Sequence, residues 1–83
     1  MKITLKFFST LADFLPAGAE DNVVEMEADS PASVQDIVNK LNIPLKMVHM
    51  TLVNGAYVAP GDFASRQLKD GDALAMWPPL AGG

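Results

Sequence analysis

The chain contains no cysteine and only one histidine among its 83 residues. The lack of cysteine excludes disulfides, thiolate nucleophiles and the usual structural zinc sites. Six lysines and arginines stand against ten aspartates and glutamates, which gives a formal net charge of −4. The composition therefore lacks the clustered basic residues of a nucleic-acid-binding protein, and we expect basic or apolar partner surfaces instead.

Long apolar runs are also missing. No segment approaches the roughly 18 apolar residues that crossing a bilayer requires, and residues 1–6 lack the apolar core of a signal peptide. These features predict a cytoplasmic protein without a membrane partner. A domain of this size buries only about 60% of the surface of its unfolded chain. It has room for about one sheet and one helix, so we expect no active site of its own, no metal site and no bound cofactor.

Alternation of apolar and polar residues predicts strands in five places. They are Lys2 to Phe8, Val23 to Ala28, Met50 to Leu52, Tyr57 to Val58, and Ala73 to Trp77. The turn pair Asn54-Gly55 joins the third strand to the fourth, and Asp70-Gly71-Asp72 precedes the last. The methionines Met47, Met50 and Met76 are interpreted as core residues, and His49 as a surface residue at a strand end.

Two helices are predicted. A short one runs from Thr10 to Leu15, where Thr10 and Asp13 have the spacing of a capping box. The longer one begins at Ser33, which can cap the first turn together with Asp36. Its apolar stripe has helical spacing and consists of Val34, Ile37, Val38 and Leu41. The order of elements predicts an α+β domain in which the main helix crosses one face of a mixed sheet.

Three aromatic side chains are predicted on the sheet face opposite the core. By the alternation of their own strands, Phe8, Tyr57 and Trp77 all point away from the predicted helix. If the first and last strands are neighbours, these aromatics form one exposed patch. An exposed apolar patch on a small soluble protein is typical of a docking surface. The alternative for Trp77 is packing beneath the residues that follow it.

The last six residues differ in composition from the rest of the chain. After Trp77 the sequence reads Pro-Pro-Leu-Ala-Gly-Gly, from Pro78 to Gly83. Proline lacks the amide donor that a strand needs, and glycine favours the unfolded chain. We therefore predict a domain over residues 1–77 and an extended tail over residues 78–83. Gly82 and Gly83 have no side chains, so a terminal carboxylate could pass down a narrow channel in a partner, whereas the competing interpretation is a frayed end or a cloning scar.

Taken together, these segments resemble the small subunit of molybdopterin synthase and, more broadly, the MoaD/ThiS sulfur carriers. The resemblance rests on Phe7-Phe8, Ser33, Val53-Asn54-Gly55, Asp70-Gly71-Asp72 and the ending Trp77 to Gly83. It implies the ubiquitin-like β-grasp fold. It also implies that an ATP-dependent adenylating enzyme activates Gly83 and that the carboxylate becomes a thiocarboxylate, with Gly82 beside it. The large synthase subunit, or another acceptor enzyme, then takes the sulfur for the cofactor that holds molybdenum or tungsten.

The resemblance further implies which residues contact these partners. They are Phe8, Tyr57, Trp77, Pro78, Pro79, Leu80 and Ala81. Three alternatives stay open at this point. The chain could carry sulfur for another pathway such as thiazole synthesis, it could be a ubiquitin-like modifier conjugated through Gly83, or it could be a non-covalent interaction module with an inert tail.

Overall fold

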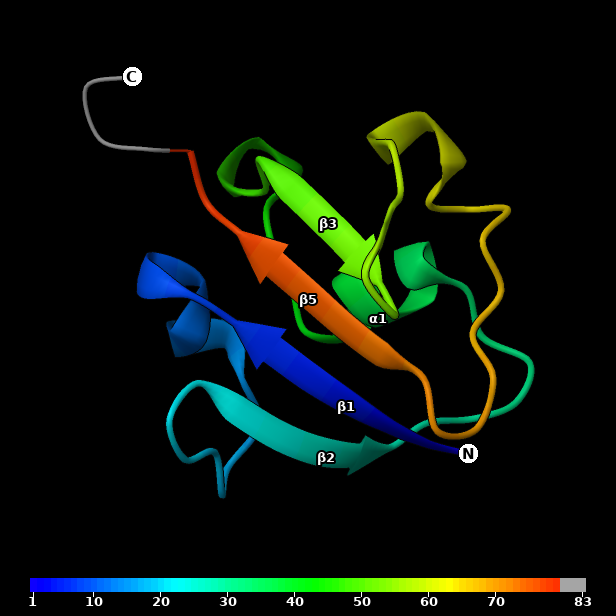
Figure 1. The fold of residues 1–83 in the computed structure, drawn as a ribbon, viewed down its shortest axis with the longest axis horizontal. Coiled ribbons are helices and arrows are strands. Elements are labelled where there is room, and N and C mark those ends of the chain that lie inside the picture. Colours follow the sequence, from blue (N-terminus) through cyan, green and yellow to red (C-terminus); the bar gives the residue numbers. More distant parts are fainter. Residues whose placement is uncertain (80–83) are drawn as a thin grey trace.

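A computed structural model describes residues 1–79, which form a five-stranded sheet with an α-helix packed on one face (Figure 1). In chain order the elements are β1 (Lys2–Phe7), the 3₁₀ helix η1 (Ser9–Phe14), β2 (Val23–Glu27), α1 (Val34–Lys40), the 3₁₀ helix η2 (Leu45–Met47), β3 (Met50–Val53), β4 (Ala56–Tyr57), the 3₁₀ helix η3 (Pro60–Asp62) and β5 (Ala73–Trp77). The predicted α+β class with one main helix is confirmed. No helix within this part of the chain is long and apolar enough to cross a membrane.

The strands are ordered β2-β1-β5-β3-β4 across the sheet. β1 and β5 are parallel, with Leu5 opposite Leu74, whereas every other neighbouring pair is antiparallel. Parallel neighbours need a long connection, and here that connection contains α1 and the β3–β4 hairpin. The first and last strands therefore lie side by side at the centre of the sheet, which is the condition for the predicted aromatic patch.

The helix begins as the sequence predicts. The Ser33 hydroxyl accepts a hydrogen bond from the Asp36 amide at 3.1 Å, and the Asp36 carboxylate accepts one from the Ser33 amide at 2.8 Å. This reciprocal pair is a capping box, which satisfies two amides that the first turn would otherwise leave open. Val34, Ile37 and Val38 then face the sheet and are buried.

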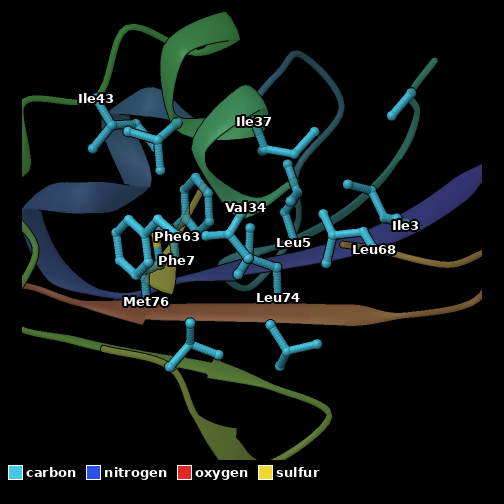
Figure 2. Packing of buried hydrophobic residues seen from close by; sticks show 14 of the residues in the cluster. Ile3, Leu5, Phe7, Val34, Ile37, Ile43, Phe63, Leu68, Leu74 and Met76 are labelled. Carbon is cyan, nitrogen blue, oxygen red and sulfur yellow. The ribbon is translucent and has the colours of Figure 1, made fainter. Parts of the chain in front are cut away.

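The core lies between α1 and the inner face of the sheet (Figure 2). Val34 and Ile37 of the helix lie above Leu5 and Leu74 of the sheet. On the sheet side of the core, β1 and β5 supply fully buried residues. The long connection from β4 to β5 closes the core with two further side chains, Phe63 and Leu68. These two were not among the predicted core residues.

Both predicted turns are present and need unusual backbone angles. Asn54 and Gly55 have φ values of 51° and 84°, and Gly71 has a φ of 89°. Asn and Gly adopt positive φ at least cost, which explains their presence at these positions.

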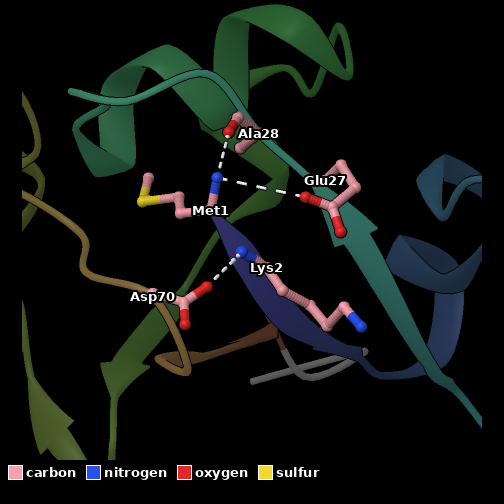
Figure 3. Close-up of polar contacts among 5 residues, drawn as sticks. All are labelled: Met1, Lys2, Glu27, Ala28 and Asp70. Carbon is pink, nitrogen blue, oxygen red and sulfur yellow. Dashed lines mark hydrogen bonds and ion pairs between the residues drawn. The ribbon is translucent and has the colours of Figure 1, made fainter.

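The start of β1 is held on both sides (Figure 3). On one side, the Lys2 amide donates a hydrogen bond to the Asp70 carboxylate at 2.7 Å. On the other side, the Met1 ammonium group donates to the Ala28 carbonyl at 2.8 Å and lies 4.0 Å from the Glu27 carboxylate. The end of β2 and the turn before β5 are therefore tied to Met1 and Lys2.

Two local predictions are wrong. The 3₁₀ helix η1 begins at Ser9, and its cap is Phe8 with no side-chain hydrogen bond, so Thr10 forms no capping box. The reason is that the chain turns directly out of β1, and the Leu11 amide donates to the Phe8 carbonyl at 3.1 Å. Met50 is 36% exposed and lies outside the core. Thr51 occupies the inward position beside it.

Candidate functional site

The sheet face opposite α1 carries an apolar band. The register places Leu52 of β3 opposite both Ala75 of β5 and Tyr57 of β4, and it places Met50 opposite Trp77. Directly opposed residues point to the same face of a sheet. We use "apolar band" for the outward residues Phe8, Met50, Leu52, Tyr57, Ala75 and Trp77. The band runs from the centre of the sheet to the edge formed by β4.

Phe8 and Trp77 are in direct contact. Their ring centroids are 4.6 Å apart and their planes differ by 11°, so the rings are stacked. Each ring covers part of the other, and both residues are half-buried. The predicted meeting of these two aromatics is confirmed, and it follows from the parallel pairing of β1 with β5.

The backbone around the stacked pair is fixed by hydrogen bonds. The Phe8 amide donates to the Met76 carbonyl at 3.1 Å, and the His49 amide donates to the Trp77 carbonyl at 2.8 Å. The last two residues of β5 are thus held by the residues that flank β1 and β3. The Trp77 indole ring is presented by a rigid part of the sheet, which lowers the entropy cost of docking a partner there. His49 itself is exposed at a strand end, as predicted.

Tyr57 lies on the same face but apart from the stacked pair. Its side chain is 61% exposed at the β4 edge, and Leu52 and Ala75 connect it across the sheet to the centre. The three predicted aromatics therefore share one face, with two of them in contact and the third at its margin.

Two members of the band, Met50 and Leu52, were not predicted to belong to it. The signal was present in the alternation, because an inward Thr51 forces both neighbours outward. Met50 was predicted to be a core residue. The structure corrects this prediction, since Thr51 is the inward residue and is 1% exposed.

The predicted tail begins beyond the sheet. Pro78 is half-buried, Pro79 is exposed, and neither belongs to a strand. The other predicted site residues of the tail, Leu80, Ala81, Gly82 and Gly83, lie outside the described residues. β5 therefore leads from the apolar band into the segment that carries the predicted chemistry.

The other end of β5 is anchored by Asp72. Its carboxylate accepts hydrogen bonds from the Asn54 side chain at 2.9 Å and from the Lys69 amide at 2.8 Å. Burial by itself would raise the pKa of Asp72, but these hydrogen bonds and the positive charges of Arg66 and Lys69 outweigh it and lower that pKa. Asp72 is thus a structural anion at the turn before β5.

The chemistry that the band offers is recognition. Its six side chains include no carboxylate, amine or imidazole, and its one polar group is the Tyr57 hydroxyl at the margin, so the band consists mainly of apolar area and aromatic rings. Large aromatics on rigid strands are typical of the residues that dominate protein–protein affinity. The arrangement is suited to holding a second protein next to residues 78–83.

Comparison with known proteins is consistent with this geometry. The family model described as Mut7-C ubiquitin matches residues 1–81, and comparison with curated proteins gives no match. Among solved structures, the chain is similar to the putative molybdopterin converting factor, subunit 1, from Pyrococcus furiosus, with 25% identity, coverage of 95% of this chain and 98% of that one, and a TM-score of 0.66. Small archaeal modifier protein 1 of H. volcanii is 25% identical over 95% of this chain and 98% of its own, with a TM-score of 0.67.

A third solved structure is the complex of subunits 1 and 2 of the molybdopterin-converting factor from Helicobacter pylori 26695. The match is 20% identical, covers 100% of both chains and has a TM-score of 0.60, which shows a shared fold. The ubiquitin-like resemblance inferred from the sequence is confirmed by these matches.

Proposed function

Because this chain belongs to the Mut7-C ubiquitin family, we propose that it is a ubiquitin-like sulfur carrier whose Gly83 carboxyl group accepts and delivers sulfur. The pathway we favour is the synthesis of the molybdopterin cofactor. The chain is the cargo-bearing partner in this proposal, and the enzymes that act on it supply the catalytic groups.

The proposed chemistry takes place on one carbon atom. An adenylating enzyme joins the Gly83 carboxylate to the adenylate of ATP and releases pyrophosphate. A sulfide-level sulfur then attacks the activated carbonyl and displaces AMP, which leaves a thiocarboxylate without any change in the oxidation state of the carbon. In the acceptor enzyme this sulfur is transferred to a pterin precursor, and a carboxylate is restored by water.

The observation that carries the proposal is the position of the apolar band relative to the tail. Trp77 is both a member of the band and the last residue of β5, and Pro78 and Pro79 follow it at once. A partner docked on Phe8 and Trp77 therefore lies beside Pro78 and Pro79, with which the predicted tail begins. Since the chain need not contribute an active site, the apolar composition of the band suits this role.

Two of the similar structures support the choice of pathway and partner. The Pyrococcus furiosus protein is described as a putative subunit 1 of a molybdopterin converting factor. The Helicobacter pylori protein was solved as a complex of subunits 1 and 2. We therefore propose a large synthase subunit as the acceptor and a separate adenylating enzyme as the activator.

The direct test is the intact mass of the protein before and after activation. The starting mass establishes first whether the chain ends at Gly83, as the proposal requires. After incubation with the adenylating enzyme of the same organism, ATP and a sulfide donor, we expect a mass gain equal to the replacement of one oxygen by sulfur. A chain without Gly83 should keep its mass.

A control variant alters the sheet away from the apolar band. Val23→Ala removes an exposed apolar side chain from β2, at the sheet edge opposite β4. We expect this variant to gain sulfur at the rate of the unaltered protein. If no adenylating enzyme of the organism produces the mass gain, or if the gain persists without Gly83, the proposal is wrong.

A second function has its own support in the likeness to small archaeal modifier protein 1. In that case Gly83 forms an isopeptide bond with lysines of other proteins. High-mass conjugates in cell extracts that disappear when Gly83 is deleted would establish this use. The same adenylated intermediate serves both functions, so the thiocarboxylate assay and the conjugate assay are read independently.

A further inference from the structure

The outer edge of β2 has open backbone hydrogen-bonding groups. β2 is the first strand in the sheet order, so β1 is its only neighbour among residues 1–79. Its alternate residues bond to β1, as the Ala28 amide does to the Met1 carbonyl at 2.8 Å. The backbone amide and carbonyl of Val23 also point away from β1, but they form two hydrogen bonds of 3.0 Å with the backbone of Glu20. Glu25 and Glu27 therefore direct their amides and carbonyls to an edge that no strand within residues 1–79 covers.

The edge lies within a strongly acidic part of the chain. Residues 7–39 contain no lysine or arginine. Their acidic residues are Asp13, Glu20, Asp21, Glu25, Glu27, Asp29 and Asp36. All six of the chain's basic residues are therefore outside this segment, and three acidic residues accompany them. The edge strand and the connections on both sides of it form the acidic part of a charge-asymmetric molecule.

The inner side of the same edge has apolar surface that is not fully covered. Val24 and Met26 point toward the core from β2 but are only half-buried. Beyond the end of β2, a hollow of about 240 Å³ opens between α1 and the connection that leads from β2 to it. Its walls include Ala28, Ala32 and Ile37 together with Asp29, Asp36 and Lys40. Figure 3 shows Ala28 at this position, between Met1 and the helix above it.

From the open edge, the acidic charge and the half-covered inner face together, we infer that β2 is a docking site for an extended basic segment of a partner protein. The segment adds to the sheet as a sixth strand and pairs with the backbone of Glu25 and Glu27. Its outward residues are lysine or arginine, because they stand beside these two glutamates. Its inward residues are aliphatic, because they extend the layer of Val24 and Met26 toward the hollow.

The two glutamates contribute unequally. Glu27 is directly opposite Lys2 on the neighbouring strand, whereas Glu25 is opposite the uncharged Thr4. The charge of Glu25 is therefore the less neutralised of the two, and this residue is the principal electrostatic anchor for the incoming segment.

The Glu27 side chain is 75% exposed. Because Glu27 projects this far into solvent, it can contact a basic residue of the incoming segment in addition to Lys2 of β1.

The site lies away from the end of β5. Two strand positions separate β2 from β5 in the sheet order, with β1 between them. A partner that adds a strand to β2 therefore leaves Phe8 and Trp77 free for a second protein. This site goes beyond the proposed sulfur transfer and does not depend on it, because no step of the binding involves Gly83.

The probe is a synthetic peptide with alternating basic and aliphatic residues, acetyl-Lys-Val-Arg-Val-Lys-Val-amide, titrated into the full chain and followed by NMR. We expect shifts centred on β2 and on the hollow beside α1. The amides of Glu25 and Glu27 should exchange with solvent about tenfold more slowly, because the peptide supplies the missing strand. A peptide of the same composition with its basic residues contiguous serves as the sequence control and should bind more weakly.

Variants of Glu25 separate charge from backbone pairing. Glu25→Lys should weaken binding at least about tenfold, because like charges side by side on paired strands are unfavourable. Asp62→Lys makes the same charge change at an exposed position of η3 and should bind as the unaltered chain does. Glu25→Pro removes the outward amide, which edge strands tolerate, and it should bind more weakly than Glu25→Gln. Thermal unfolding of each variant establishes that it is folded.

Three results would overturn the inference. The peptide could produce no shifts, its shifts could centre on Trp77 and Tyr57, or Asp62→Lys could weaken binding as much as Glu25→Lys. The last result would mean that net charge alone attracts the peptide. None of these outcomes bears on the mass gain at Gly83, so the failure of this site and the failure of sulfur transfer are distinguishable.

Discussion

At the scale of single residues, the most informative side chains are polar ones in buried positions. Asp72 is 8% exposed and accepts hydrogen bonds from two other segments. Thr51 is 1% exposed, and its hydroxyl has no hydrogen-bond partner among the described residues. A satisfied carboxylate stabilises the fold, whereas an unsatisfied hydroxyl costs free energy. The two residues therefore predict opposite responses to substitution.

For Asp72 the prediction concerns pH. Its pKa is lowered in the folded chain, so its contribution to stability is present above the unfolded pKa of about 3.9 and is lost as the pH falls through the folded pKa. Asp72→Asn should be less stable at neutral pH and should lose less stability between about pH 5 and pH 2. Urea unfolding at a series of pH values measures both. Asp13→Asn, at an exposed position of η1, should follow the unaltered chain, and parallel curves for Asp72→Asn would contradict the prediction.

For Thr51 the prediction is a gain in stability. Thr51→Val replaces the unpartnered hydroxyl with a methyl group of similar size, and we expect the free energy of unfolding to rise by about 1 kcal/mol. The matched control is Thr4→Val on the outer face of β1, where a change within about 0.5 kcal/mol is expected. Denaturant unfolding compares the two, and a destabilised Thr51→Val would show that the hydroxyl has a partner in solution.

At the scale of elements, α1 shows how much a short helix depends on its first turn. It has seven residues, which is too few for an isolated helix to persist in water. Its capping box and the burial of three of its side chains supply the stability that intrinsic helix propensity does not. Ser33→Ala should therefore cost about 1 kcal/mol of stability, and Ile37→Ala about 2–5 kcal/mol because it leaves a cavity. Thermal unfolding tests this order, and a Ser33→Ala variant as stable as the unaltered chain would contradict it.

The elements also show where sequence reasoning succeeds. β1, α1 and β5 have a clear hydrophobic period and recognisable ends, and they were predicted to within a residue or so. Phe63 and Leu68 could not be predicted as core residues, because the connection between β4 and β5 has neither helical nor strand spacing. The inward Thr51 was unpredictable for a different reason. Which face of a short strand is buried depends on its neighbours, and these are set by tertiary pairing.

The candidate site divides in the same way. The meeting of Phe8 and Trp77 could be predicted only under the condition that the first and last strands are neighbours, because each residue places an aromatic on the outer face of its own strand. Met50 and Leu52 could not be assigned to the same face from residue type alone. That β2 forms an edge of the sheet can be recognised only from the strand order, which no local pattern in the sequence contains.

At the scale of the whole molecule, folding and docking use different surfaces. α1 and the inner face of the sheet make the core, whereas Phe8 and Trp77 lie on the outer face. We therefore expect Trp77→Ala and Phe8→Ala to weaken binding to the large synthase subunit at least about tenfold, as truncation of an aromatic hot spot does, with a smaller effect on folding. Calorimetric titration and thermal unfolding measure the two effects. A collapse in thermal stability with normal affinity of the folded fraction would mean that the pair is structural.

The central position of β5 also determines when the sheet can form. β5 joins the β1–β2 hairpin to the β3–β4 hairpin, and it is the last strand of the described chain to be synthesised. Until Trp77 has left the ribosome, the two hairpins have no strand between them, and such non-local pairing is completed late in folding. The residues after Trp77 consequently become available to another enzyme only when all five strands of the sheet have been synthesised, so that activation acts on a chain that is ready to fold.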